Sequence, residues 1–596
     1  MASSLFLLAA ALAAPAWSSV PTLAPQDLHP GQKAVVKTVF EGVRVEDFEA
    51  EIVGVLKGGR AEGDMILARA TSERVVRSGV AQGMSGSPVY VEGRLIGALS
   101  SGWSFSREPL FGVTPIGEML AVLDLPSRPD AEGSAGPSGI ESASGDVQFG
   151  EFRWDEPGGR PIPAVPPVNH GPTPLGVPLV CGGLRPAALE VTRRLFEPLG
   201  FFVTPGGRDP AGGPPADSLR PGSAVAVDVL TGDLQLAAIG TLTWRDGDRV
   251  LIFGHPLFQS GNVKLPLATA EITTIVASDL MSFKLGVRGR PVGTLTQDRR
   301  ASMAGRVGAS PHLLPVVVEI VSSGGRRQTF HFASIEDRAL APQLVGVAAL
   351  NSLLESGGTG ANQTLRWTLR MTRRGAAPLT VSDAVAGEAP VADLLSAVAA
   401  PLRFLLNNPF ATLKLDSVTV TIAAAPSRES WTLRSARVLD AAVRPGGAMR
   451  IECEVERWHG DRSIVSTTLT VPEEVPDGRY VLWLGGGAEL SRYEASRLPG
   501  RYRPTSLDDA WRRLAGIRPG DALYATLLAG APEVTREGRD YPELPISALA
   551  LLAGTQRTGD GGRRGDVAIL DERRVPFHGP VRGELLLSVQ VDAKAP

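Results

Sequence analysis

Glycine and proline recur along the whole of this chain and limit how long its helices and strands can be. The 596 residues include 68 glycines and 48 prolines, whereas aromatic residues make up only 6%. Both residues interrupt helices and favour turns, so the composition predicts many short strands joined by turns. A chain of this length also exceeds one hydrophobic core, and about 150 residues per domain suggests three or four domains. We therefore expect a mainly β protein.

Charge and cysteine usage narrow the function classes. The 60 basic and 63 acidic residues nearly cancel, so no general attraction to nucleic acid or to an anionic membrane is expected. Cys181 and Cys453 lie far apart and have no metal-ligand spacing, which predicts neither a zinc site nor a thiol protease. A disulfide between them and two buried free thiols both remain open. No metal or cofactor is expected.

The first 19 residues have the pattern of a secretory signal peptide. Residues 5–14 are almost entirely apolar, and the small residues Ala16, Ser18 and Ser19 follow. An apolar run of about ten residues is too short to span a bilayer, which favours a cleaved signal over an anchor. Asp393 and Arg403 interrupt the best later candidate for a span. The sequence therefore predicts a secreted or periplasmic protein without an integral membrane span after signal cleavage.

Composition and periodicity divide the rest of the chain. Alternating apolar and polar residues predict half-buried strands, for example over 34–40, 236–244 and 449–456. Helices are predicted over 115–123, 185–199, 391–406 and 507–514. The predicted units are a signal peptide (1–19), a strand-rich segment (29–125), a Ser, Gly and Pro-rich linker (126–174), a second strand-rich segment (175–375), a β-sandwich-like domain (376–490) and a small α+β region (491–596).

One short motif in the first strand-rich segment suggests a nucleophile. Gly83-Met84-Ser85-Gly86-Ser87-Pro88 precedes a hairpin pattern over 89–99. Two glycines beside a serine allow a tight turn that projects the Ser85 hydroxyl and lets the N–H groups of Gly83 and Ser85 converge on an oxyanion. The alternative is a plain turn before a hairpin. An esterase of α/β-hydrolase type is not favoured, because the serine precedes a hairpin and not a helix.

A serine hydroxyl needs a base, because it is a poor nucleophile without one. Of the seven histidines, His255 is singled out because it follows directly on a predicted strand, in Gly254-His255. Ordinary surface or structural roles are expected for the other six, which are His29, His170, His312, His331, His459 and His578.

The string G-M-S-G-S-P with V-Y-V-E-G-R-L-I-G-A behind it closely resembles the SpoIVB-like serine peptidases, family S55. The strand over 237–244 followed by Gly254-His255 resembles the family's histidine motif, and residues 292–306 resemble a third family segment. The resemblance implies a trypsin-like double β-barrel core assembled from 29–125 and 175–375. It also implies Ser85 as nucleophile, His255 as base, and protein or peptide substrates without a cofactor.

The chain departs from the family pattern in two ways. The serine motif precedes the histidine motif, whereas the family has the reverse order, so the chain looks circularly permuted; permutation is tolerated when the contacts are kept. Ala70 stands where the family has its catalytic aspartate. The sequence leaves several replacement acids open, namely Asp64, Glu73, Asp246, Asp248 and Glu271. The alternative function is a catalytically weak or inactive binding or scaffold protein of the cell envelope.

Overall fold

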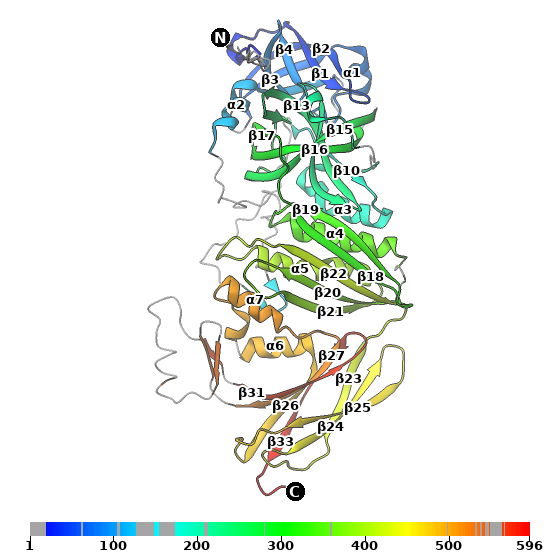
Figure 1. Ribbon diagram of the computed structural model, residues 1–596, viewed down its shortest axis with the longest axis vertical. Coiled ribbons are helices and arrows are strands. Elements are labelled where there is room, and N and C mark those ends of the chain that lie inside the picture. The colour runs from blue at the N-terminus through cyan, green and yellow to red at the C-terminus, as the bar shows by residue number, and fades with distance from the viewer. Residues whose placement is uncertain are drawn as a thin grey trace, which may run out of the picture.

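A computed structural model describes residues 20–596 of the chain. Outside the description lie residues 1–19, 61–62, 104–105, 107, 127–147, 154–172, 208–211, 279–280, 358–359, 361, 498, 531–532, 537–538, 543–547, 549–562 and 566. The predicted signal peptide and most of the predicted linker fall in these ranges. Figure 1 shows the N-terminal strands at one end of an elongated molecule and the C-terminal strands at the other. Within the described residues, no helix has the length and apolar character that a bilayer crossing needs.

The N-terminal segment forms a closed ring of six antiparallel strands, which we call the first ring. Its strands, in order around the ring, are β4 (Pro88–Val91), β1 (Lys33–Val39), β2 (Val45–Arg60), β3 (Gly63–Ala70), β6 (Leu110–Pro115) and β5 (Arg94–Gly102). The pairing of β5 with β4 closes it. Alternate side chains of β1 are buried, as a pleated strand with one face on a core requires. The short helices α1 (Glu73–Ser78) and α2 (Ile116–Ala121) complete this segment.

A second closed ring of six antiparallel strands follows. Its strands, in order, are β13 (Gln235–Asp246), β14 (Arg249–Ile252), β17 (Ser302–Val307), β16 (Phe283–Arg299), β15 (Gly261–Val276) and β12 (Ala224–Gly232). The pairing of β12 with β13 closes this second ring. β10 (Val177–Gly182) adds to β13, and β11 (Phe201–Gly206) adds to β10, with α3 (Pro186–Phe196) between them in sequence.

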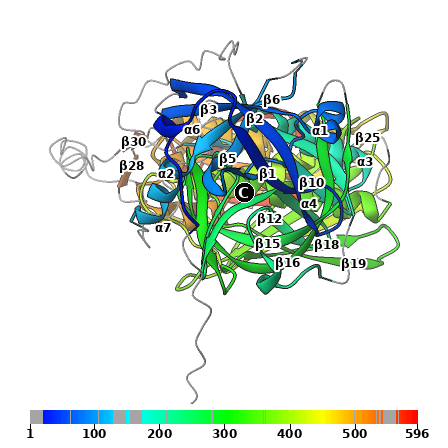
Figure 2. The same ribbon diagram turned by 90° about the horizontal axis from the view of Figure 1, so that it is seen from above.

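The two rings pack on each other through apolar side chains. One cluster joins Val39 of the first ring to Ile239 and Ile272 of the second. Another joins Ala98 and its neighbours to Trp244 of the second ring. Figure 2, which looks from above, shows β1 and β5 lying over the strands of the second ring. Residues far apart in sequence therefore meet at the contact between the rings.

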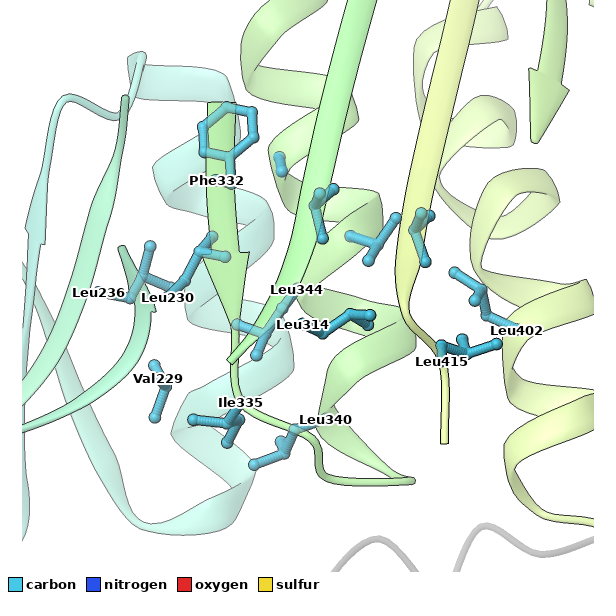
Figure 3. Close-up of a cluster of buried hydrophobic side chains, with 14 of the residues drawn as sticks. Val229, Leu230, Leu236, Leu314, Phe332, Ile335, Leu340, Leu344, Leu402 and Leu415 are labelled. Atoms are coloured by element: carbon cyan, nitrogen blue, oxygen red, sulfur yellow. The ribbon is translucent and has the colours of Figure 1, made fainter. Parts of the chain in front are cut away.

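The sheet of the second ring continues beyond β12, and a layer of helices packs on its added strands. The added strands, in order, are β19 (Arg327–Ser334), β18 (Leu314–Val321), β22 (Ser417–Ala425), β20 (Thr364–Thr372) and β21 (Leu379–Ala386). Helices α4 (Leu340–Glu355) and α5 (Pro390–Leu406) pack on it, and Figure 3 shows Leu344 of α4 beside Leu314 of β18, and Leu402 of α5 beside Leu415. The largest hydrophobic core lies here.

Two four-stranded sheets form a sandwich at the C-terminal end. One sheet contains β25 (Arg462–Thr470), β24 (Ala448–Arg457), β23 (Trp431–Val438) and β32 (Val581–Arg582). The other contains β31 (Ala568–Pro576), β27 (Ala522–Ala529), β26 (Gly478–Gly486) and β33 (Glu584–Val591). Leucines and valines from both sheets share one core. The boundary predicted at residue 490 therefore separates β26 from its partners β27 and β33, which arrive later in sequence.

The remaining elements are small. Helices α6 (Gly487–Arg497) and α7 (Leu507–Ala515) lie between the helical layer and the sandwich (Figure 1). The short strands are β7 (Gln148–Phe149), β8 (Phe152–Arg153), β9 (Thr173–Pro174), β28 (Glu533–Arg536), β29 (Arg539–Pro542) and β30 (Arg563–Gly565).

The architecture confirms the prediction of a mainly β protein with barrel-like sheets. The four predicted helices are present as α2, α3, α5 and α7, and Ser506 caps α7 by accepting the Asp509 N–H at 3.1 Å. Helix α4 escaped prediction because it is apolar on almost every face and buried along most of its length. Its sequence shows no amphipathic period to distinguish it from strand.

Candidate active site

Ser85 lies in a tight loop at the contact between the rings, residues 82–87, which we call the serine loop. Gly83 and Gly86 have φ angles of +86° and +90°, a region that favours glycine. A side chain at Gly86 would also meet the Phe253 backbone N at 2.5 Å. Both glycines of the motif are therefore required by the backbone, and the second by close contact with the other ring.

Every carbonyl of the serine loop from Gln82 to Gly86 is held by a hydrogen bond. Met84 is bonded within the loop, by the Ser87 N–H at 2.9 Å. The other four carbonyls accept bonds from the second ring. These are Lys284 N–H to Gln82 at 2.9 Å, Thr241 Oγ1 to Gly83 at 3.0 Å, Thr241 N–H to Ser85 at 2.9 Å and Thr243 Oγ1 to Gly86 at 2.7 Å.

Unlike these carbonyls, the N–H groups of the same loop are not all hydrogen-bonded within the described residues. The N–H groups of Met84 and Gly86 donate to Ala81 and Leu99 at 3.0 and 2.7 Å. Those of Gly83 and Ser85 donate to no partner among the residues that the structure describes. A trans peptide points its N–H away from its carbonyl, so clamping the Gln82 and Met84 carbonyls turns these two N–H groups the other way. They are the pair that the sequence predicts as oxyanion donors.

His255 follows β14 in a second loop, residues 253–260, which we call the histidine loop. The loop begins with a three-residue turn in which Gly254 N–H donates to the Ile252 carbonyl at 2.9 Å. Its central residue, Phe253, has φ +71°, a conformation that costs a bulky side chain about 1–3 kcal/mol. Backbone strain of this kind is concentrated at functional sites.

The tautomer of His255 follows from the hydrogen bond at Nδ1. Nδ1 lies 2.7 Å from the Pro256 carbonyl oxygen, which can only accept, so Nδ1 carries the proton. Burial lowers the pKa of His255 to about 4, and the Pro256 carbonyl opposes that shift. The imidazole is therefore neutral at pH 7, and Nε2 presents a free lone pair. This is the form that a general base requires.

The buried carboxylate of Asp298 accepts hydrogen bonds from the backbone of the histidine loop. Asp298 accepts the N–H of Leu257 on Oδ1 at 2.8 Å, and the N–H groups of Phe258 and Ser260 on Oδ2 at 2.8 and 3.2 Å. Burial raises the pKa of Asp298, while these backbone donors oppose the rise. Asp298 does not bond the imidazole itself. It fixes the turn whose Pro256 carbonyl orients His255.

The two loops interlock across the rings. Phe253 contacts Gly86, as described above, and the Gly254 carbonyl accepts the Thr114 hydroxyl of β6 at 2.7 Å. A side chain at Gly254 would meet Ala98 Cβ at 3.0 Å. Residues flanking Ser85 and His255 are thus in direct contact, although about 170 positions separate them in sequence.

The candidate pair, Ser85 and His255, is buried, and the two side chains are not hydrogen-bonded to each other. Ser85 is 0% exposed and His255 4% exposed. Neither Ser85 Oγ nor His255 Nε2 has a hydrogen-bond partner within the described part of the chain, so they do not bond each other. Because Ser85 is fully buried, its hydroxyl is not accessible to a substrate in this arrangement.

A comparison with known protein families gives a match to the part of the chain that contains the serine loop. Residues 13–114 match the family described as SpoIVB peptidase S55. Residues 13–114 are therefore similar to S55 peptidases, and we call them the S55 segment. The match contains Ser85 and the first ring as far as Thr114, and it ends before His255. No curated protein and no solved structure matches the chain.

The acids left open by the sequence do not bond His255. Asp246 and Asp248 pair with Arg249 and Arg306 at 2.6 and 2.7 Å. Asp64 accepts the Gly58 N–H at 3.0 Å, and Glu73 and Glu271 are exposed. Ala70, in the S55 segment, is buried in the core of the first ring. The orienting group of His255 is therefore a backbone carbonyl.

Other candidate groups lie apart from this site. Both cysteines are free and buried, and burial raises the pKa of the Cys453 thiol to about 11. His312 is exposed and pairs with Glu336 at 2.7 Å, whereas His170 lies outside the described residues. Among the described residues, no group of three His, Cys, Asp or Glu side chains is arranged to hold a metal ion.

Two residues of the site escaped the sequence reasoning. Asp298 lies in the third S55-like segment, where its position after a strand pattern was the available signal. Lys284 interrupts an otherwise ordinary strand pattern, and only the fold shows that it is buried beside the serine loop.

Proposed function

We propose that the protein is an exported serine endopeptidase with a trypsin-like arrangement of two six-stranded barrels. Ser85 is the nucleophile, His255 the general base, and the N–H groups of Gly83 and Ser85 form the oxyanion hole. The observation that carries the proposal is the serine loop, in which five carbonyls are held and these two N–H groups are left unbonded. An S55 segment over residues 13–114 supports a serine peptidase at family level.

The reaction follows from these groups. Nε2 of neutral His255 takes the proton of the Ser85 hydroxyl as Oγ attacks the scissile carbonyl. The negative charge that develops on the carbonyl oxygen is stabilised by the two N–H groups. The imidazolium then gives its proton to the leaving amine, and a water molecule hydrolyses the acyl-enzyme by the same route. No cofactor takes part, and the substrate is a protein or peptide.

The Pro256 carbonyl takes over one of the two tasks of a catalytic aspartate. It holds the tautomer with a proton on Nδ1, and the wrong tautomer accounts for the large rate loss when a triad aspartate is neutralised. It does not supply a negative charge to stabilise the imidazolium. Since burial also lowers the pKa of His255 to about 4, His255 is a weak base and turnover is slow.

Export and the circularly permuted order belong to the same proposal. The signal-like residues 1–19 support secretion into the periplasm or the medium. The permuted order is compatible with the fold, because the serine and histidine loops meet through contacts between two separately closed rings.

A catalytically inactive S55-like scaffold protein is the second candidate. The burial of Ser85 and the missing bond between Ser85 Oγ and His255 Nε2 favour it, as does Ala70 in the family's acid position. Intact oxyanion donors and the free Nε2 lone pair favour the enzyme, because a scaffold has no need of either.

Labelling with a fluorophosphonate probe separates the two candidates. We expect the purified protein to label at Ser85, Ser85→Ala to remain unlabelled, and His255→Ala to label about 10³-fold more slowly or not at all. Exposed Ser218→Ala and His312→Ala serve as matched controls and should label like the wild type. Intact-mass and peptide analysis locate the adduct. Absence of labelling in a folded wild type, after hours of incubation, would support the scaffold.

A further inference from the structure

Lys284 of β16 is a lysine in a place that ordinarily excludes lysine. It is 0% exposed, and buried lysines are rare unless they are paired. Its Nζ donates to Thr38 Oγ1 at 2.8 Å and to Thr241 Oγ1 at 3.3 Å. Among the described residues no carboxylate contacts it, so it is held by neutral hydroxyls alone. Such a costly placement calls for a function.

Both hydroxyls are hydrogen-bonded to residues of the serine loop. Thr241 Oγ1 donates to the Gly83 carbonyl at 3.0 Å. Thr38 Oγ1 accepts the Ser87 hydroxyl, also at 3.0 Å. The two contacts lie on either side of Ser85. Nζ of Lys284 therefore links the two ends of the loop that carries the nucleophile.

The rest of Lys284 supports the same loop. Its backbone N–H donates to the Gln82 carbonyl at 2.9 Å, which turns the Gly83 N–H outward. Its aliphatic stem lies against Gly83, where an added side chain would meet Lys284 Cβ at 3.2 Å and Cδ at 3.4 Å. Lys284 thus contacts the loop directly through its backbone and its stem, and its Nζ acts on the loop through Thr38 and Thr241.

We propose that Lys284 is a positioning residue that fixes the serine loop with the Gly83 and Ser85 N–H groups directed at the oxyanion. It contacts neither substrate nor reacting atoms, and acts through Thr38, Thr241 and the Gln82 carbonyl. The inference rests on the proposed peptidase function for its effect on reactivity. Its effect on loop order is independent of that function.

The surroundings of Nζ make this support sensitive to pH. Thr38 on β1, Thr241 on β13 and Ser87 on the serine loop face it with hydroxyls, and none of these elements places a charged side chain in hydrogen-bond contact with it. Burial lowers the pKa of Lys284 to about 7. The neutral amine has two N–H groups for its two hydroxyl partners, whereas the ammonium adds a charge and a third N–H. The loop is therefore best ordered when Lys284 is neutral.

The test compares Lys284→Met with the wild type through two readouts. Met matches the stem and removes the amine. We expect fluorophosphonate labelling of the wild type to rise about tenfold between pH 6 and 8, as one group near pH 7 loses its proton. Lys284→Met should label at least about tenfold more slowly at pH 8 and lack this rise. Hydrogen exchange of the peptide containing residues 82–87 should be faster in the variant, with peptides of β24 unchanged.

Two further variants keep the result interpretable. Lys37→Met removes a partly buried lysine on β1 that pairs with Asp47 at 2.9 Å, and it should behave like the wild type in both readouts. Thr38→Val removes only one hydroxyl of the linkage. It should change both readouts in the same direction as Lys284→Met but less, and it replaces that variant should Lys284→Met fail to fold.

The outcomes separate this inference from the proposed function. If the wild type does not label, but loop exchange depends on Lys284, the positioning role stands and the peptidase fails. If the variants label more slowly while loop exchange is unchanged, or if neither readout changes, the positioning role of Lys284 is wrong. A melting temperature that is unchanged or higher in Lys284→Met, together with slower labelling, distinguishes positioning from a general loss of stability.

Discussion

The serine loop and the histidine loop meet at one site but are held in different ways. Four of the five carbonyls from Gln82 to Gly86 are bonded by the second ring, through Thr241, Thr243 and Lys284. The histidine loop is held from within its own ring by Asp298. Ser85 is therefore positioned mainly by the other ring, and His255 mainly by its own ring. Breaking the contact between rings should disorder the first, while losing Asp298 should disorder the second.

This difference bears on the order of the motifs. All contacts that shape the serine loop from outside are non-covalent contacts between two separately closed rings. Such contacts depend on which surfaces meet and not on which ring comes first in the chain. A peptidase site built this way is compatible with a permuted chain, provided that each ring keeps its own strands and loops.

The largest expected effect comes from removing the internal anchor of the histidine loop. Asp298→Ala leaves several buried N–H groups without an acceptor, and should lower the free energy of unfolding by about 3–5 kcal/mol. Urea denaturation measures this. Asp248→Ala on the same ring removes an exposed carboxylate paired with Arg306 and should change stability by less than about 0.5 kcal/mol. Equal losses in both variants would show that Asp298 does not hold the loop.

Introducing an aspartate at position 70, where the S55 pattern has one, should destabilise the protein, because Ala70 lies in the core of the first ring. Ala70→Asp buries a carboxylate among apolar side chains and should cost about 3 kcal/mol in unfolding free energy, with no gain in labelling. Thr71→Asp, at the exposed next position, should be nearly neutral. A stable Ala70→Asp with faster labelling would instead place the orienting acid on the serine side.

How far the sequence leads depends on what each residue touches. The sequence predicts roles for Gly83 and Ser85 from the local signature of a tight turn, and for His255 from its place after a strand and the resemblance of Gly254-His255 to the S55 histidine motif. Asp298 and Lys284 have no such signature, since their roles depend on which backbone groups the fold brings within about 3 Å of them. Helix α4 was missed for a related reason. Its burial on nearly every face removes the period that identifies a helix in sequence.

The C-terminal sandwich is a second case in which the fold and not the local sequence decides which residues meet. Its strands alternate as predicted, but β32 and β33 join the two sheets from the end of the chain. Long-range pairing of this kind is decided by the shared core and not by the turn signals between neighbouring strands. The sequence predicts the strands here but not their partners.

The protonation of His255 gives a smaller effect that sharpens the comparison. Its pKa is about 4 in the folded protein, below the ordinary 6.5, so the unfolded chain binds more protons between these values. Stability should therefore fall as pH drops from 6.5 to 4, by at most about 1.4 kcal/mol per pH unit from this group. His255→Gln should remove that part of the slope in urea titrations, whereas exposed His312→Gln should keep it. Identical slopes in all three proteins would contradict a buried neutral His255.

The smallest effect tests the external hold on the serine loop at a single bond. Thr243→Val keeps the shape of the side chain but removes the hydroxyl that donates to the Gly86 carbonyl at 2.7 Å, and should cost about 1 kcal/mol. Buried Thr192→Val in α3 is the matched control. Its hydroxyl donates to the Ala188 carbonyl within a helix, where the backbone supplies a donor as well, so a smaller loss is expected. Because Thr243 belongs to the second ring, slower labelling of Ser85 in Thr243→Val, at unchanged pH dependence of His255, would show that the nucleophile is positioned across the contact between the rings. Unchanged labelling would mean that the serine loop keeps its shape without this bond.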